Sequence, residues 1–344
     1  MKKSPAKAKK NTAAAKSRKV PVLKKPLMKK QPVLNLAPNV AVRELSTVRD
    51  FIRYAVSRFN RADLFFGHGT FNVFDEAVFL VLEGLRLPVE QLEPYYDARL
   101  LADEKKRIAA LIEARIKTRK PTAYLVNKTY LKGYPFYVDE RVIVPRSYIA
   151  DLLFEDVTGG ENGQEAGFAL IEDPESVTSV LDLCTGSGCL AIIASYLFPN
   201  ATVDAVDLSP DAVAVANINV ANCLHNDRIT VYQGDLFAPL KGKKYDFIIT
   251  NPPYVDAEDM VGMPPEYYHE PQMALEAGDD GLDIVHRILA EAPDHLNEGG
   301  NIICEIGYGR PALEDARPDI DFLWLDTENS EGEVFWLSKE QLEG

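Results

Sequence analysis

The chain has 344 residues, of which 46% are hydrophobic, and it carries 38 Lys and Arg against 52 Asp and Glu, a net charge of −14. This length leaves room for two domains and a large core, and no apolar run approaches the roughly 18 residues of a membrane span. The four cysteines form no Cys-x-x-Cys pair and have no histidine at a metal-ligand spacing, so we expect reduced thiols in a cytoplasmic protein, with neither a metal nor a disulfide.

Charge is distributed unevenly along the chain. Residues 1–40 hold 12 Lys and Arg and no Asp or Glu, and their Lys-, Ala- and Pro-rich composition predicts a disordered basic tail. Such a tail is often merely solvated, and the sharper interpretation is a weak tether to RNA phosphates. Residues 141–344 hold 10 basic and 38 acidic residues, a net of −28. That part repels nucleic acid and attracts cationic proteins, although an acidic surface can also serve solubility alone.

Residues 41–125 are predicted to form a helical domain. Apolar residues recur at helical spacing from Val48 to Phe59, from Phe74 to Val81 and again over 107–116, and we expect these stripes to lie in the core. His68 lies between two glycines, which favours a turn histidine on a flexible polar loop over a residue that touches a substrate.

The pattern changes after residue 125. From 126 to 144 the apolar period shifts towards two around Gly133 and Pro135, which predicts a hairpin that links the helical domain to residues 145–344. Arg146 follows directly. It is as well suited to a structural ion pair as to holding a carboxylate of a ligand.

A glycine turn opens the second domain. Residues 180–191 predict a strand, a turn with Gly186 and Gly188, and then a helix whose first N–H groups are unpaired. Asp207 ends the next apolar run, 201–206, where a carboxylate can accept both hydroxyls of a ribose. The pattern fits a dinucleotide as well as S-adenosylmethionine, and Asp207 by itself could be one more solvated carboxylate.

Two further positions follow at strand ends. A strand over 228–232 precedes Asp235, which is placed to accept a hydrogen bond from an adenine amine, although Gly-Asp is also a common turn. The apolar run 245–250 then leads into Asn251-Pro252-Pro253-Tyr254. The two prolines stiffen this loop, so Asn251 and Tyr254 are held at the sheet edge where open α/β folds bind ligands. Four successive predicted strands thus each end in a segment that can contact a ligand. Together these four segments predict an S-adenosylmethionine pocket with a methyl acceptor at the fourth strand.

The chain resembles the bacterial protein-glutamine methyltransferases, and within them the branch that modifies large-subunit ribosomal protein L3. The glycine turn and Asn251-Pro252-Pro253-Tyr254 are shared widely, whereas Gly67-His68-Gly69-Thr70 and Asp75-Glu76-Ala77-Val78 match this branch. Further matching segments are residues 54–59, 136–147, 251–260 and 269–271. The tail, residues 159–167 and residues 308–310 lie outside the resemblance.

The resemblance implies a Rossmann-like class I methyltransferase with a seven-stranded, mostly parallel sheet, preceded by a small helical domain that recognises the substrate. The later strands are expected near 301–306, 322–326 and 334–337, with the last hairpin antiparallel. The loop over 270–278 is expected to border the active site. The expected cofactor-binding residues are Asp182, Thr185, Gly186, Ser187, Gly188, Asp207, Asp235, Leu236 and Asn251.

The expected reaction is methylation of a glutamine side-chain amide in the basic ribosomal protein L3. Asn251 and the Pro252 carbonyl would accept the amide N–H bonds, Tyr254 would pack on the amide face, and Pro253 would complete the substrate site. Since no histidine or carboxylate dyad adjoins the loop in sequence, we expect no strong base before methyl transfer. The basic tail would then contact ribosomal RNA weakly.

Three other functions remain open from the sequence. A release-factor glutamine methyltransferase is the nearest, and the segments between Gly67 and Val78 argue against it. A nucleic-acid adenine methyltransferase shares the Asn-Pro-Pro-Tyr loop, and the net charge of −28 opposes it. A non-catalytic ribosome assembly factor would not need the complete tetrapeptide.

Overall fold

The computed structural model describes residues 38–158 and 169–344. The predicted basic tail, apart from its last three residues, and the whole of the 159–167 segment lie outside this part of the chain. The helices before the sheet are α1 (Pro38–Glu44), α2 (Val48–Ala62), α3 (Val73–Leu85), α4 (Ala102–Thr118) and α5 (Thr122–Val126).

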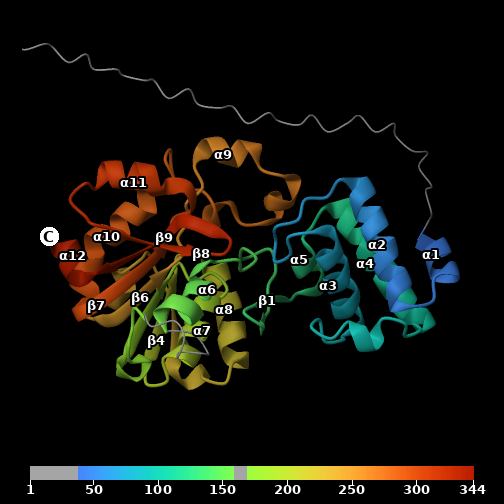
Figure 1. The fold of residues 1–344 in the computed structure, drawn as a ribbon, viewed down its shortest axis with the longest axis horizontal. Coiled ribbons are helices and arrows are strands. Elements are labelled where there is room, and N and C mark those ends of the chain that lie inside the picture. The colour runs from blue at the N-terminus through green and yellow to red at the C-terminus, as the bar shows by residue number, and fades with distance from the viewer. Residues whose placement is uncertain (1–37, 159–168) are drawn as a thin grey trace, which may run out of the picture. The chain divides into compact units, whose positions relative to one another are not determined.

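Capping residues mark where two of the N-terminal helices begin. Thr47 and Asp50 form a capping box at the start of α2, and the Asn72 side chain accepts the N–H groups of Phe74 and Asp75 at the start of α3. The helices α2, α3 and α4 pack side by side around a shared apolar core (Figure 1). One predicted core residue is wrong: Phe74 is 46% exposed, because it lies on the first turn of α3, before the buried stripe that begins at Glu76 and Ala77.

A seven-stranded sheet forms the second half of the described chain. The order is β5-β4-β3-β6-β7-β9-β8, in which β3 to β7 are parallel and β9 pairs antiparallel with both β7 and β8. This confirms the predicted fold class, including the antiparallel last hairpin. The strands are β3 (Ser179–Leu183), β4 (Thr202–Asp207), β5 (Ile229–Gln233), β6 (Tyr245–Thr250), β7 (Leu296–Glu305), β8 (Leu323–Thr327) and β9 (Ser330–Ser338).

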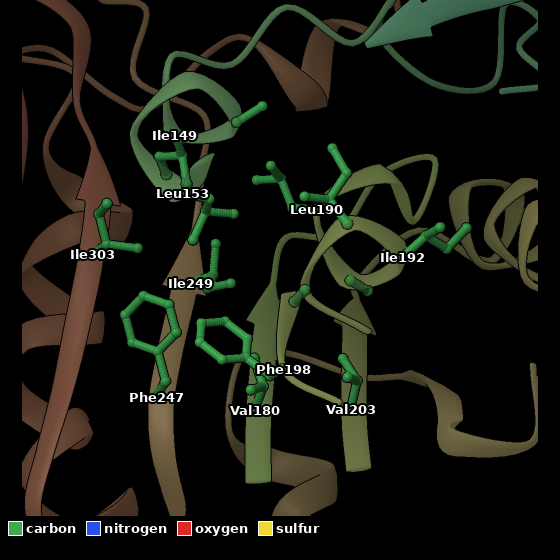
Figure 2. Close-up of a cluster of buried hydrophobic side chains, with 14 of the residues drawn as sticks. Ile149, Leu153, Val180, Leu190, Ile192, Phe198, Val203, Phe247, Ile249 and Ile303 are labelled. Atoms are coloured by element: carbon green, nitrogen blue, oxygen red, sulfur yellow. The ribbon is translucent and has the colours of Figure 1, made fainter. Parts of the chain in front are cut away.

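Helices cover both faces of the sheet. Alternate strand residues point to opposite faces. Val180 therefore packs against α6 (Ile149–Leu152) and α7 (Cys189–Leu197), whereas Leu181 packs against α10 (Asp283–His295). Figure 2 shows Val180, Val203 and Phe247 from three neighbouring strands beside Leu190 and Ile192 of α7. The helices of this part are α6 (Ile149–Leu152), α7 (Cys189–Leu197), α8 (Pro210–Asn222), α9 (Ala257–Gly262), α10 (Asp283–His295), α11 (Arg310–Ala316) and α12 (Lys339–Glu343).

A short antiparallel hairpin, β1 (Thr129–Leu131) with β2 (Tyr134–Phe136), lies between the helices and the sheet in sequence, as predicted. The segment that follows it packs Val138, Val142 and Val144 against Tyr124 of α5 and Val215 of α8. This cluster makes a continuous apolar contact from the N-terminal helices to the helix layer of the sheet. Within the described residues, none of the helices combines the length and apolarity that a bilayer crossing demands.

Candidate active site

A cavity of about 220 Å³ opens at the carboxyl ends of the central strands. This is the sheet edge where the sequence predicts a ligand site. Of the predicted site residues, those that line it are Gly186, Ser187, Asp207, Asp235, Leu236, Asn251 and Pro253. The others, Asp182, Thr185, Gly188, Pro252 and Tyr254, are not among the lining residues.

Hydrogen bonds to the Asp182 carboxylate hold the glycine turn after β3 in place. One of its carboxylate oxygens accepts Thr185 Oγ1 at 2.5 Å and the Ala191 N–H at 3.0 Å, which ties the turn to the first turn of α7. Burial raises the pKa of the Asp182 carboxyl to about 7, although these two hydrogen bonds lower it. Asp182 and Thr185 therefore shape the turn while Gly186 and Ser187 line the cavity.

Two buried polar atoms at this turn have no hydrogen-bond partner among the described residues. They are the second Asp182 oxygen and the hydroxyl of Ser187. Buried polar groups are nearly always paired, so the unpaired Ser187 hydroxyl, on a residue that lines the cavity, indicates a polar ligand. Together with the Asp207 carboxylate at the next strand end, the donors and acceptors present suit a cofactor with a ribose and a charged amino-acid part.

Asp207 adjoins the glycine turn at the end of β4. Its two oxygens accept the Gly186 N–H at 2.8 Å and the Ser209 N–H at 2.9 Å. Burial raises the pKa of the Asp207 carboxyl and these two hydrogen bonds lower it. Each carboxylate oxygen keeps a further lone pair, so the geometry leaves room for hydroxyl donors from a ligand.

Asp235 and Leu236 follow β5. Leu236 has a φ of 47°, a left-handed conformation that is costly for a branched side chain, and Cys184 at the end of β3 has a φ of 58°. Both residues line the cavity, and such strain is concentrated at binding sites. The Asp235 carboxylate accepts the Arg287 guanidinium of α10 at 2.8 Å. Arg287 also lines the cavity, and sequence reasoning missed it because α10 gave no strand-end signal.

The loop after β6 presents Asn251 and Pro253 to the cavity. The Tyr254 ring instead packs against Gly307, and its hydroxyl donates to Glu305 Oε1 at 3.0 Å. One carboxylate that the sequence analysis did not place here, Glu305 at the end of the neighbouring strand β7, therefore adjoins the loop. A glutamate at the end of a predicted strand was the signal that could have found it. It is a single carboxylate and not a dyad, so the expectation that no strong base acts before methyl transfer stays a prediction.

A buried carboxylate, Glu270, forms an ion pair beside the loop. Arg146 donates to both oxygens of Glu270, at 2.7 and 2.8 Å, and the Val144 N–H donates to the same carboxylate at 2.9 Å. Arg146 thus makes a structural ion pair, and it also lines the cavity, so the alternative that it holds a carboxylate of a ligand stays a prediction. His68, expected on a flexible polar loop, is instead only 3% exposed, with Nε2 3.6 Å from Glu270 and its ring 4.5 Å from that of Tyr267.

This ion pair makes stability depend on pH. Burial raises the pKa of the Glu270 carboxyl, but Arg146 and His68 together lower it to about 2, from an ordinary value of 4.5. A lowered pKa stabilises the fold above pH 4.5, and this stabilisation is lost as pH falls towards 2. We expect the free energy of unfolding to fall across this window by on the order of 3 kcal/mol through Glu270.

Urea unfolding at pH 6, 4 and 3 measures this dependence. Glu270→Gln should be less stable at pH 6 and should show a weaker dependence on pH than the wild type. Asp103→Asn, which changes a carboxylate that is 93% exposed, is the matched control and should keep the wild-type slope. Equal slopes for the wild type and Glu270→Gln would contradict the expectation.

The loop over 255–277 also contacts the N-terminal helices. Glu266, in the 3₁₀ helix η6 (Pro265–His269), is fully buried. Its Oε1 lies 2.8 Å from the Arg119 guanidinium and 3.5 Å from that of Arg115, which is the last buried residue of α4. The same oxygen accepts the Phe65 N–H at 3.0 Å. The loop that borders the cavity is therefore fixed on one side to the helical part of the chain.

Known proteins are similar in sequence to this chain, both around the cavity and over most of its length. Residues 168–263 match the family model of the methyltransferase small domain. A ribosomal protein uL3 glutamine methyltransferase of Bradyrhizobium diazoefficiens is 57% identical over 300 residues, which are 87% of this chain and 93% of that protein. The chain belongs to the family of ribosomal protein uL3 glutamine methyltransferases.

Other members of the uL3 glutamine methyltransferase family agree. The Burkholderia pseudomallei protein is 51% identical over 86% of this chain and 95% of its own length. The Neisseria gonorrhoeae protein is 49% identical over 89% of this chain and 99% of its own length. These proteins are S-adenosylmethionine-dependent protein-glutamine methyltransferases, so the resemblance drawn from the sequence is confirmed and the dinucleotide alternative is set aside. No group of ligands for a metal ion occurs in residues 38–158 and 169–344.

Proposed function

We propose that this protein methylates the side-chain amide nitrogen of a glutamine in ribosomal protein uL3, with S-adenosylmethionine as methyl donor. The observation that carries this is the identity of 57% across 93% of a uL3 glutamine methyltransferase, with Asn251 at the wall of the cavity. When bound, S-adenosylmethionine supplies an electrophilic methyl group.

The chain offers a coherent set of residues to hold this cofactor. Gly186, Ser187 and Gly188 bring the backbone of the turn to the amino-acid part, with Asp182 and Thr185 holding that turn from below. Asp207 accepts the ribose hydroxyls. Asp235 and Leu236 border the adenine, with Asp235 accepting its amine, and Asn251 closes the site at the fourth strand.

The loop after β6 binds and orients the glutamine. Its amide nitrogen is a poor nucleophile, because its lone pair is shared with the carbonyl. The Asn251 side-chain oxygen and the Pro252 carbonyl accept its two N–H bonds, and Pro253 and Tyr254 form the surface against which the amide lies. These acceptors act more strongly as positive charge develops on the nitrogen, so they favour the transition state over the bound substrate.

The helical part, residues 41–125, recognises uL3 in this proposal, and the hairpin over 126–144 links it to the methyltransferase domain at 145–344. The buried contacts of Glu266 with Arg115 and Arg119 support such a role, since they connect the helices to the loop that borders the cavity. A net charge of −28 over residues 141–344 suits a strongly basic ribosomal protein encountered in the cytoplasm.

A methyl-transfer assay tests the function. Purified uL3 and a translation release factor are incubated side by side with labelled S-adenosylmethionine, and peptide mass spectrometry locates the label. We expect label on a glutamine of uL3 alone. Label on the release factor instead would keep the chemistry and move the chain to the sister branch. Cofactor binding without label on either protein would overturn the proposal.

The basic tail gives a separate expectation. With 12 Lys and Arg and no acidic residue in residues 1–40, it should add a weak, salt-dependent contact with ribosomal RNA. We expect deletion of residues 1–37 to lower ribosome association at low salt and to leave methylation of isolated uL3 unchanged. Co-sedimentation with ribosomes over a salt series measures this, and association that is unaffected by both the deletion and salt would contradict it.

A further inference from the structure

Glu305, the last residue of β7, lies at the centre of a buried hydrogen-bond cluster that the proposed mechanism does not use. It is 1% exposed. Its Oε1 accepts the Tyr254 hydroxyl at 3.0 Å, and its Oε2 accepts Ser147 Oγ at 2.6 Å and the Tyr148 N–H at 3.0 Å. Three hydrogen bonds therefore hold both oxygens of the Glu305 carboxyl group.

Burying a carboxylate in this position costs free energy. Burial raises the pKa of Glu305, and the hydrogen bonds from Ser147 and Tyr254 oppose that rise. No lysine or arginine of the described residues forms an ion pair with it. A buried charge without a counter-ion costs several kcal/mol unless hydrogen bonds compensate it, so packing alone does not account for a glutamate at this position.

Two glycines lie close to Tyr254, one against its ring and one against its backbone. A Cβ on Gly307 would lie 2.8 Å from the ring carbons Cδ2 and Cε2 of Tyr254. A Cβ on Gly281 would lie 2.4 Å from the Tyr254 carbonyl oxygen. Both glycines have positive φ, 53° and 75°. The ring therefore packs directly on the backbone at Gly307, and its hydroxyl bond to Glu305 holds the outer end of the ring.

We propose that Glu305 is a positioning residue for methyl transfer, which holds the Tyr254 ring in the orientation that the acceptor glutamine requires. The inference rests on the proposed function, because it gives Tyr254 its role beside the amide. Glu305 contacts neither substrate nor cofactor in this account. In this proposal Glu305 affects catalysis only through its hydrogen bond with Tyr254. In the structural alternative, Glu305 only caps the start of α6 through Ser147 and the Tyr148 N–H. The two roles can be distinguished by experiment because they depend on different hydrogen bonds.

A double-mutant cycle in the full-length protein separates the two roles. Glu305→Gln and Tyr254→Phe should each lower kcat on uL3 by roughly tenfold to a hundredfold, the range of one hydrogen bond to a charged group. Both variants should keep the KM for uL3 and the Kd for S-adenosylmethionine within about threefold. Since Tyr254→Phe already removes the bond, adding Glu305→Gln to it should lower kcat no further.

Multiplying effects in the double variant, or an unchanged kcat in either single variant, would overturn the inference. Tyr254→Phe keeps the ring and removes only the hydroxyl, so it tests the idea even where Glu305→Gln does not fold. Glu333→Gln, which removes a carboxylate from the neighbouring strand β9, is the control and should keep kcat within about twofold. Wild-type protein that fails to label uL3 would overturn the proposed function itself, whereas additive effects in an active enzyme would overturn the role of Glu305 alone.

Discussion

Asn251→Ala is expected to lower kcat for uL3 methylation by roughly 100- to 1,000-fold, the usual effect of removing one preorganised polar group that stabilises transition-state charge. The residue lines the cavity at the end of β6, on a loop that two prolines stiffen. An alanine there leaves an N–H of the substrate amide without its acceptor and lets the amide rotate. Steady-state kinetics with purified uL3 measures the effect.

Cofactor affinity distinguishes this role from a structural one. Calorimetric titration of Asn251→Ala with S-adenosylmethionine should give a Kd within about threefold of the wild type. Asp207→Asn is the contrasting variant, because its carboxylate should bind the ribose, and it should lose affinity by roughly tenfold or more. If Asn251→Ala loses affinity as strongly as turnover, the residue mainly holds the cofactor and its proposed role is wrong.

Arg115→Met should lower the free energy of unfolding by about 3–5 kcal/mol. The Arg115 side chain is 1% exposed; its Nε donates to Glu76 at 2.7 Å and its Nη2 to the Phe65 carbonyl at 2.9 Å. Glu76 also accepts the hydroxyls of Thr70 and Thr122. The methionine fills a similar volume but leaves two buried carboxylates, Glu76 and Glu266, without this cation.

The same helix supplies the control. Lys106, on the exposed side of α4, pairs with Asp103 at 2.9 Å, but both side chains are more than half exposed, at 67% and 93%. Lys106→Met should therefore change the free energy of unfolding by no more than about 0.5 kcal/mol. Urea denaturation followed by circular dichroism compares the two variants. A loss under about 1 kcal/mol for Arg115→Met would mean that the buried network does not stabilise the fold.

The sheet could be predicted from the sequence almost strand by strand, because buried parallel strands appear as short apolar runs with turn residues after them. The run 245–250 corresponds to β6 within the same bounds. The exposed Phe74 shows the limit of this approach. Periodicity assigns a residue to a helix face but does not say which turn of that face the neighbouring helices cover.

Parts of the site could not be predicted, since they depend on residues distant in sequence. His68 and Glu270 are about 200 positions apart, and no local pattern indicates that the glycine-flanked loop is buried against that carboxylate. Arg287 meets Asp235 only because α10 packs back over the strand ends. The Tyr254–Glu305 bond joins the loop after β6 to the end of the neighbouring strand β7, so only the strand order brings these residues together.

The burial of Glu266 has a consequence for engineering this family. Its carboxylate belongs to the catalytic half of the chain, whereas Arg115 and Arg119, the cations that neutralise it, belong to the helical half. A chimera that exchanged residues 41–125 for those of a sister enzyme would leave this charge buried without its partners unless matching arginines came with the graft. Residues 41–125 are therefore not a detachable module, and transplanting them requires that the loop over 264–270 be transferred with the helices.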